Sequence, residues 1–216
     1  YPDSEDKDER FIINRTFNLA LKEPSILDFI DGMPSGSVFY DLGACIGSFS
    51  LYADKVGHYV YSFEPDPINY KRFKDASLIN NCNISLHNIA INDGARDSEV
   101  LMVESNVNHG HHRILKTDNF SGAEYLNKNI SASKNTYEVK VDAMSIDDFV
   151  LNGCNQFPAY MKVDIDGSEA LFVSGAERTL SDPRLMGVMF ELDKNAEQYN
   201  FIIDKMNGFG LEIRSE

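Results

Sequence analysis

Two acids and two glycines follow one another at a spacing that suits the binding of an adenosine. Asp41, Gly43 and Gly47 lie in the segment VFYDLGACIGSFS, and Glu64 follows 21 residues after Gly43 in YVYSFEPDP. The pattern predicts a strand, a glycine loop, a helix and a second strand that ends in the acid. In such a unit the loop and the helix start approach one end of the ligand, and the distal carboxylate accepts hydrogen bonds from a ribose diol.

The loop itself distinguishes between adenosine cofactors. A dinucleotide site has the spacing G-x-G-x-x-G, and its second glycine lets the backbone approach a pyrophosphate. Here Ala44 follows Gly43 directly, and Asp41 precedes the loop. A carboxylate repels a pyrophosphate but attracts the sulfonium and the amino group of S-adenosylmethionine. These residues therefore favour the methyl donor over NAD.

Each of these residues also has a purely structural interpretation. The two glycines could serve only a tight turn and close helix packing. Asp41 could cap the following helix, and Glu64 could be a turn residue in E-P-D-P. The position at a strand end favours the binding role, because open α/β sheets bind their ligands there.

The elements that must position these residues alternate between short β-rich runs and helical runs. The expected strands are 37–41, 59–64, 84–88, 159–164 and 186–191. The expected helices are 47–56, 67–80, 168–180 and 194–207. Near-continuous apolar strands separated by helices predict an α/β fold with a mostly parallel central sheet and helices on both faces.

Two regions lie outside this alternation. Residues 1–35 are expected to form a helical N-terminal lead-in, with Pro24 opening a helix, before a domain over 36–216. Residues 97–143 contain SEVLMVE and TYEVKVDAM on either side of a polar stretch, which predicts paired strands that carry a long loop. Long loops in compact domains commonly form lids or substrate sites, so we expect 97–143 to be a substrate or lid insertion.

Composition narrows the range of partners. The 216 residues fit one domain, no apolar run reaches the length of a membrane span, and the net charge of −14 argues against nucleic acid as a substrate. The three cysteines, Cys45, Cys82 and Cys154, are widely spaced without a CxxC, which predicts reduced thiols and a cytoplasmic protein. Small molecules, sugars and proteins remain as possible partners.

Several ordered blocks extend the pattern over most of the chain. They are DLGACIGSFS, SFEPDPINYKRFKDASLINN, HNIAINDG, VDAMSIDDF, YMKVDIDGSEALFVSGAERTL and MFEL. Over roughly residues 36–195 they resemble the FkbM family of S-adenosylmethionine-dependent methyltransferases. The resemblance implies a class I Rossmann-like methyltransferase fold. It also implies, most often, O-methylation of a hydroxyl on a sugar, a glycan or a natural product.

The resemblance further implies a role for each matching position. The residues that would bind the cofactor lie in the loop and at the ends of the first three strands: Asp41, Gly43, Gly47, Glu64, Pro65, Asn88, Ile89 and Ala90. The first three would contact the methionine half, Glu64 would hold the ribose, and 88–90 would line the adenine. Asp164 would face the methyl group from the fourth strand end. Family members commonly have D-x-E-G here, whereas this chain has the shorter Asp166 before Gly167.

O-methylation of a sugar requires that the attacking hydroxyl lose its proton. A nearby base typically contributes about 10²–10⁴-fold to the rate. The candidates are Asp164 and the histidines of N-H-G-H-H, which are His109, His111 and His112. A histidine has its pKa near neutrality, which suits base catalysis, but a solvated loop would explain the same cluster.

A divalent cation is a further possibility. Asp164, Asp166, Glu191 and Asp193 fall at or just past strand ends on one edge of the sheet. Oxygen ligands that converge there would suit Mg²⁺ or Ca²⁺, which could bind a substrate diol and lower its pKa. The alternative is a set of separate solvated carboxylates and helix caps.

Two other functions compete with methyl transfer. One is an NAD(P)-linked oxidoreductase on a Rossmann fold, which the missing third glycine and the absence of a suitably placed Tyr-x-x-x-Lys pair disfavour. The other is a non-catalytic module that keeps the cofactor fold in order to bind a partner. Both alternatives make different predictions from a methyltransferase for donor binding and transfer.

Overall fold

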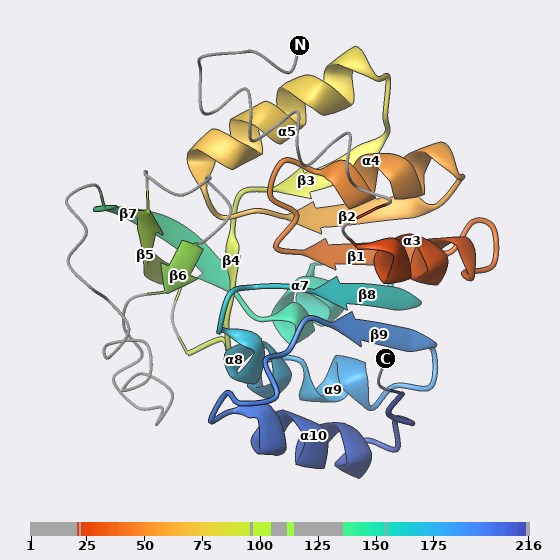
Figure 1. Cartoon of the computed structure of the whole chain (residues 1–216), viewed down its shortest axis with the longest axis vertical. Helices are drawn as coiled ribbons and strands as arrows, with labels where there is room; N and C mark the ends of the chain where they lie inside the picture. Colours follow the sequence, from red (N-terminus) through yellow and green to blue (C-terminus); the bar gives the residue numbers. More distant parts are fainter. Residues whose placement is uncertain are drawn as a thin grey trace.

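The central sheet is the element on which the site is built. The computed structural model describes residues 21, 23–95, 97–104, 112–114, 136–153 and 155–214. Five strands form a parallel sheet in the order β3-β2-β1-β8-β9 (Figure 1). They are β1 (Val38–Leu42), β2 (Tyr59–Phe63), β3 (Ile84–His87), β8 (Tyr160–Val163) and β9 (Gly187–Phe190). This confirms the predicted α/β fold with a mostly parallel sheet.

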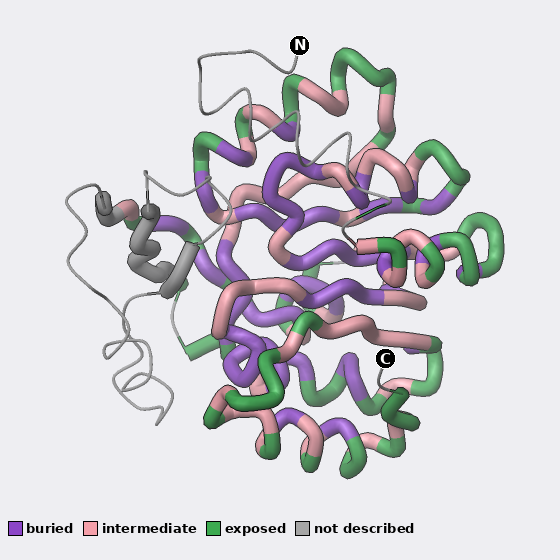
Figure 2. Tube along the Cα trace, in the orientation of Figure 1, coloured by how far each residue is buried: buried purple, intermediate pink, exposed green. Residues whose placement is uncertain are grey.

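Helices cover both faces of this sheet. They are α3 (Pro24–Asp31), α4 (Ser48–Lys55), α5 (Pro67–Ile79), α7 (Ile146–Asn152), α8 (Glu169–Ser174), α9 (Glu177–Leu180) and α10 (Tyr199–Gly208). Successive side chains of a strand point to opposite faces. Phe39 of β1 accordingly packs with apolar residues of α3 and α4, whereas Tyr40 packs with those of α7, α8 and α10. Figure 2 shows the buried residues concentrated along the strands between these two layers.

A second, smaller sheet lies beside the first. It has the order β4-β7-β5-β6 and consists of β4 (Ala90–Ile91), β5 (Ser98–Glu104), β6 (His112–Ile114) and β7 (Thr136–Met144) (Figure 1). The antiparallel pairing of β5 with β7 confirms that the two extended runs are paired strands. The proposed role of 97–143 as a substrate or lid insertion remains a prediction.

The C-terminal half differs from the sequence prediction in three places. The single helix expected over 168–180 is divided into α8 and α9 at Gly175. A Cβ atom there would lie 2.2 Å from the carbonyl oxygen of Asn92, so the chain passes too close to the loop after β4 for any side chain.

The helix α7 was not predicted. Ser145 caps it by accepting a hydrogen bond from the Asp148 amide at 3.1 Å. The last helix begins at Tyr199 and not near 194.

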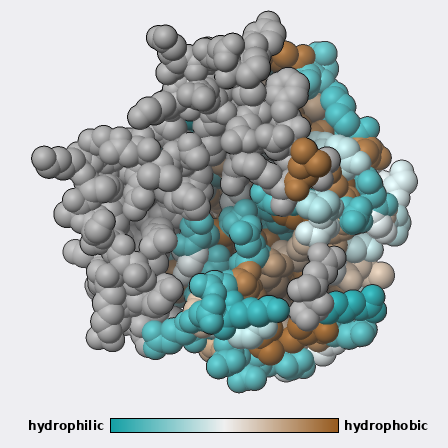
Figure 3. Space-filling view, viewed as in Figure 1, coloured by the Kyte–Doolittle hydropathy of each residue, from teal (hydrophilic) through white to brown (hydrophobic). Residues whose placement is uncertain are grey.

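The surface of the described residues is mixed. Large hydrophobic side chains are exposed at a few positions, including Leu78, Ile79 and Met186. In the view of Figure 3, hydrophobic residues reach the surface among hydrophilic ones. Within the ranges that the structure describes, no helix has the length and apolar character needed to cross a membrane.

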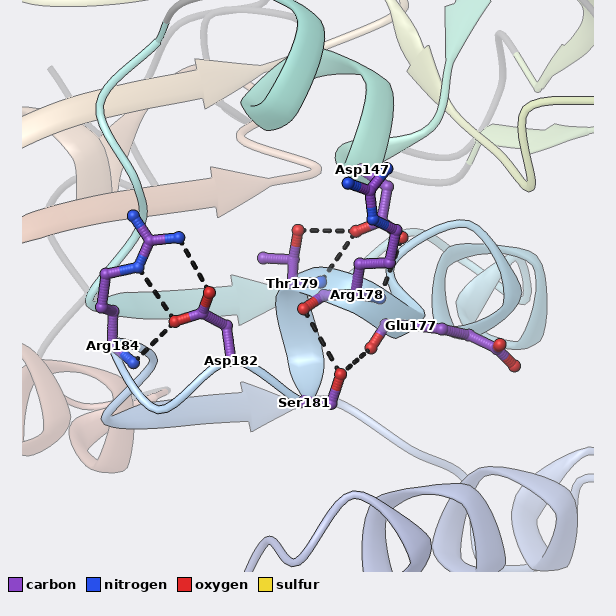
Figure 4. Close-up of polar contacts among 7 residues, drawn as sticks. All are labelled: Asp147, Glu177, Arg178, Thr179, Ser181, Asp182 and Arg184. Carbon is purple, nitrogen blue, oxygen red and sulfur yellow. Dashed lines mark hydrogen bonds and ion pairs between the residues drawn. The ribbon is translucent and has the colours of Figure 1, made fainter.

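Asp147 connects α7 to α9 (Figure 4). One of its carboxylate oxygens accepts hydrogen bonds from the amide and the hydroxyl of Thr179, at 2.8 and 2.7 Å, and the other accepts one from the Arg178 amide at 2.9 Å. These amides lie in the first turn of α9, where a helix has no internal acceptors for them. A carboxylate from α7 thus caps α9 and links the two helices.

Replacing Asp147 by alanine should destabilise the fold. Thr179 is fully buried, so its amide and hydroxyl would lose their acceptor without access to water. We expect the free energy of unfolding to fall by about 1–3 kcal/mol, measured by chemical denaturation. Asp75→Ala is the matched control, because Asp75 forms an exposed ion pair with Lys71 on α5 and should change the stability by less than about 0.5 kcal/mol. Equal losses in the two variants would contradict the capping role.

Candidate functional site

The glycine loop after β1 approaches the end of β8 closely. The amides of Gly43 and Ala44 both donate to the carbonyl oxygen of Phe63 at 3.0 Å, which fastens the loop to the end of β2. Gly43 has a φ of +78°, and a Cβ atom at this position would lie 1.7 Å from the carbonyl oxygen of Asp164. Both the left-handed backbone and the lack of space require glycine here. The loop is therefore hydrogen-bonded to the end of β2 and packed against the end of β8.

Gly47 has a requirement of a different kind. Its φ is +83°, and a Cβ atom would lie 2.2 Å from the ring of Phe73, a fully buried residue of α5. Close packing of α4 against α5 therefore explains this glycine without a ligand. A contact between Gly47 and the cofactor remains a prediction.

The carboxylate of Glu64 is held at the end of β2 by backbone amides. Its Oε2 accepts a hydrogen bond from Cys45 at 2.7 Å, and its Oε1 accepts one from Asp66 at 2.8 Å. The residue is 3% exposed, so the orientation of the group is fixed. A carboxylate oxygen can accept more than one hydrogen bond, which leaves capacity for a ribose hydroxyl. The carboxylate predicted to bind the ribose thus lies at the end of β2, in contact with the loop that carries Gly43.

The end of the third strand supports this turn. The side-chain amide of Asn88 donates to the carbonyl oxygens of Glu64 and Pro65, at 2.8 and 2.9 Å. Ile89 packs against the main core, and Ala90 is buried in β4. These contacts place 88–90 beside the turn that carries Glu64, whereas their predicted contact with the adenine is untested.

Two carboxylates and a lysine meet where β1 and β8 lie side by side. Asp41 and Lys162 are paired in the register of the two strands. The Lys162 ammonium lies 3.4 Å from Asp41 Oδ1 and 3.1 Å from Asp164 Oδ2. Burial by itself would lower the pKa of Lys162, but the charges of Asp41 and Asp164 outweigh burial and raise it, so the side chain stays charged.

This lysine was not among the predicted site residues. Its immediate neighbours, Met161 and Val163, are apolar, and a charged residue within such a strand is a signal that could have identified it. Its partner on β1 could not be known, because the pairing depends on which strands are neighbours in the sheet. The sequence pattern could therefore have indicated Lys162, but its contact with Asp41 follows only from the order of the strands in the sheet.

Asp41 has the environment expected of a group that binds a cation. It is completely buried, and its Oδ2 accepts a hydrogen bond from Ser50 at 2.6 Å. Its Oδ1 has no hydrogen-bond partner within the described residues, although Lys162 lies nearby. Buried acceptors are normally satisfied, so an additional donor such as an amino group fits this oxygen. The residues present therefore fit the methionine half of S-adenosylmethionine.

The predicted metal site is not supported. Across the part of the chain that the structure describes, no three His, Cys, Asp or Glu side chains are grouped so that they could hold a metal ion. Asp193 instead accepts hydrogen bonds from the amide and side chain of Asn195 in a local turn. The carboxylates still influence one another: the charge of Asp164 and then burial raise the pKa of Glu191. Asp166 has a left-handed φ of +49° in the turn before Gly167.

Glu169 is a second residue that the sequence prediction missed. It is 4% exposed, and burial raises the pKa of its carboxyl group. One oxygen accepts a hydrogen bond from the Gly167 amide at 3.0 Å, and the other accepts one from the Gln198 side chain at 2.7 Å. Glu169 thus ties the turn after β8 to the segment before α10. The acid in D-G-S-E lies in a segment that resembles the FkbM family, and this was a sequence signal for it.

The histidine cluster lies mostly outside the described residues. His109 and His111 lie outside the described residues, and of His112 the backbone alone is described, as the first residue of β6. The proposed base role of His111 and His112 therefore stays a prediction. The buried Cys45 sulfur accepts a hydrogen bond from the Asn69 side chain at 3.6 Å, and Cys154 lies outside the described residues.

The fold and the family define the class of protein. A parallel sheet with helices on both faces carries an acid, a glycine loop and a second acid at adjacent strand ends, as in an S-adenosylmethionine-dependent methyltransferase. The model of the methyltransferase FkbM domain matches residues 41–213. The chain belongs to the FkbM methyltransferase family.

Solved structures of other proteins also match parts of this chain. The methyltransferase FkbM of Methylobacillus flagellatus is 20% identical over 71% of this chain, with a TM-score of 0.42. A TehB-like SAM-dependent methyltransferase of Corynebacterium glutamicum is 12% identical over 96% of this chain and 85% of its own, with a TM-score of 0.48. A precorrin-6y C5,15-methyltransferase of Geobacter metallireducens is 11% identical over 88% of this chain and 72% of its own, with a TM-score of 0.47. The chain spans 32% of the length of the Methylobacillus protein, and no curated protein matches it.

Proposed function

We propose that this protein transfers a methyl group from S-adenosylmethionine to a hydroxyl oxygen of a sugar, a glycan or another natural product. The observation that carries the proposal is the joint arrangement of Asp41 and Asp164 around Lys162 at two adjacent strand ends. Asp41 is buried, whereas the Asp164 side chain is 22% exposed and can be reached from outside. One carboxylate is thus suited to hold a donor, and the other to meet an acceptor.

In this proposal the residues of the loop bind the donor. The amino group of the methionine half lies at Asp41 Oδ1, which has no hydrogen-bond partner among the described residues. The ribose hydroxyls donate to the Glu64 carboxylate, which backbone amides already orient. Gly43 lets the loop lie directly against the end of β8, and 88–90 line the adenine in this proposal.

The chain's contribution to chemistry is orientation and proton removal. The bound cofactor supplies an electrophilic methyl group on sulfur. Holding an acceptor oxygen in line with that group contributes on the order of 7–11 kcal/mol when the alignment is ideal. Asp164 accepts the hydroxyl proton in this proposal, because it is the partly exposed carboxylate of the pair. His111 and His112 are the alternative bases.

The family assignment favours this function over the two competitors. Asp41 lies buried at the strand end where a dinucleotide would need its pyrophosphate. An acidic side chain at this point is a poor neighbour for a pyrophosphate, which disfavours the oxidoreductase. A non-catalytic module would bind the donor but transfer nothing, and transfer measurements distinguish it.

Donor binding and transfer test the proposal. Calorimetry should detect binding of S-adenosylmethionine and S-adenosylhomocysteine but not of NADH. A panel of sugar and glycan acceptors with labelled donor should then identify a methylated hydroxyl. Asp164→Asn should lower the transfer rate about 10²–10⁴-fold while the donor still binds. Asp75→Asn, an exposed carboxylate on α5, is the control and should transfer normally.

Three results would contradict the proposal. Binding of NADH in place of the methyl donor would favour an oxidoreductase. Donor binding without transfer to any acceptor of the panel would favour a binding module. Full transfer activity in Asp164→Asn would remove Asp164 from the reaction and leave the histidines as the base.

A further inference from the structure

The ammonium group of Lys162 lies among side chains from three parts of the fold. Its Nζ lies between Asp41 on β1 and Asp164 after β8, and 5.6 Å from the ring centroid of Phe49 on α4. The lysine side chain is 4% exposed. A long, flexible side chain is therefore held in one place by three elements.

The two carboxylates depend on this lysine to different degrees. Asp41 also accepts a hydrogen bond from the Ser50 hydroxyl at 2.6 Å, and Ser50 in turn accepts one from Ser62 at 2.8 Å. Among the described residues, the Asp164 carboxylate receives its hydrogen bond from Lys162, at 3.1 Å. Asp164 is also the more exposed of the two. Without Lys162 it would turn to water, where an ionised carboxylate is best solvated.

We infer that Lys162 is a positioning residue for methyl transfer, which holds the Asp164 carboxylate toward the sulfonium of the bound donor. The inference rests on the proposed function, since it takes the donor to bind at this edge of the sheet. With both carboxylates ionised, the group carries one net negative charge, which the positive charge of the donor neutralises. Lys162 itself does not touch the reacting atoms.

Positioning and simple charge balance predict opposite effects of losing Lys162 on the preference for the charged donor. S-adenosylmethionine and S-adenosylhomocysteine differ by one methyl group and its positive charge. The dissociation constant of S-adenosylhomocysteine divided by that of S-adenosylmethionine measures the preference of the site for that charge. Removing a lysine charge should raise this ratio if only net charge matters. It should lower the ratio if Lys162 serves to hold Asp164 in place.

Titration calorimetry on four variants tests the inference. Asp164→Asn should lower the ratio by about tenfold, because the carboxylate opposite the sulfonium is lost. Lys162→Met should lower it by a similar factor, and the double variant should lower it no further, since both changes remove the same interaction. Lys71→Met removes an exposed lysine whose side chain is 76% exposed and should leave the ratio unchanged.

The possible outcomes separate the inference from the proposed function. A wild-type protein that binds neither ligand refutes the proposed function itself. Donor binding with a ratio that rises or stays constant in Lys162→Met, or with effects that add in the double variant, overturns the positioning role alone.

A second measurement applies if Lys162→Met does not fold. Protein labelled with ¹⁵N-lysine should give one slowly exchanging ammonium signal, from the buried Lys162, that shifts when the donor is added. In Asp164→Asn this signal should move or disappear. A signal that responds to neither change overturns the inference.

Discussion

Replacing Gly43 by alanine should abolish donor binding and strongly destabilise the protein. The new methyl group would lie 1.7 Å from the carbonyl oxygen of Asp164, a backbone atom at the end of β8 that cannot turn aside. Relief requires the loop and the strand end to separate, which also displaces Asp41 and Asp164. We expect the free energy of unfolding to fall by about 3 kcal/mol or more, measured by chemical denaturation.

Gly36 provides a matched control for this experiment. It has the same φ of +78° as Gly43, but a Cβ atom at Gly36 would meet nothing within 4 Å. Gly36→Ala therefore measures the cost of a left-handed alanine alone, about 1–2 kcal/mol, and should leave donor binding intact. If Gly43→Ala is no less stable than Gly36→Ala and binds the donor normally, the close approach of loop and strand has no functional importance.

Replacing Asp41 by asparagine should weaken the binding of both forms of the cofactor. The substitution keeps an acceptor for Ser50 but removes the charge that attracts the donor's amino group. That amino group is present before and after methyl transfer. We therefore expect the dissociation constants of S-adenosylmethionine and S-adenosylhomocysteine to rise together by about 10- to 100-fold, measured by calorimetry.

The parallel rise distinguishes Asp41 from Asp164. A change at Asp164 affects the group that faces the sulfonium, so it should alter the two constants unequally. Asp75→Asn, which lies exposed on α5, should alter neither. If Asp41→Asn weakened only S-adenosylmethionine, Asp41 would lie at the sulfonium and not at the amino group, and the proposed orientation of the donor would be wrong.

The first half of the sheet could be predicted from the sequence to within about two residues. The apolar runs that become β1 and β2 are short, and each ends at a turn, at Gly43 after β1 and at Glu64 after β2. The helix between the two strands starts after Gly47. Local signals determine these boundaries. The prediction of one helix over 168–180 was wrong because of a distant contact. The backbone at Gly175 lies close to the carbonyl oxygen of Asn92, and no local sequence pattern reports this contact.

The residues of the site could likewise be predicted where local signals determine them, but not where distant contacts do. Asp41, Gly43, Glu64 and Asp164 could be predicted to share one edge, because the carboxyl ends of parallel strands meet there. The pairing of Lys162 with Asp41 could not, since it requires β8 to be the neighbour of β1. The cation site was predicted from strand-end carboxylates alone, and position along the chain does not show whether such side chains converge.

The adjacency of β1 and β8 also bears on how the protein acquires its function. The strands β1, β2 and β3 follow one another closely in the chain, whereas β8 follows only after the whole second sheet. Contacts between segments that are distant in the chain form late, because a long loop must close before they can contribute stability. The first three strands and their helices can thus assemble while Asp41 still lacks its lysine. We expect a chain in synthesis to become able to bind the cofactor only once β8 has been made and has inserted beside β1.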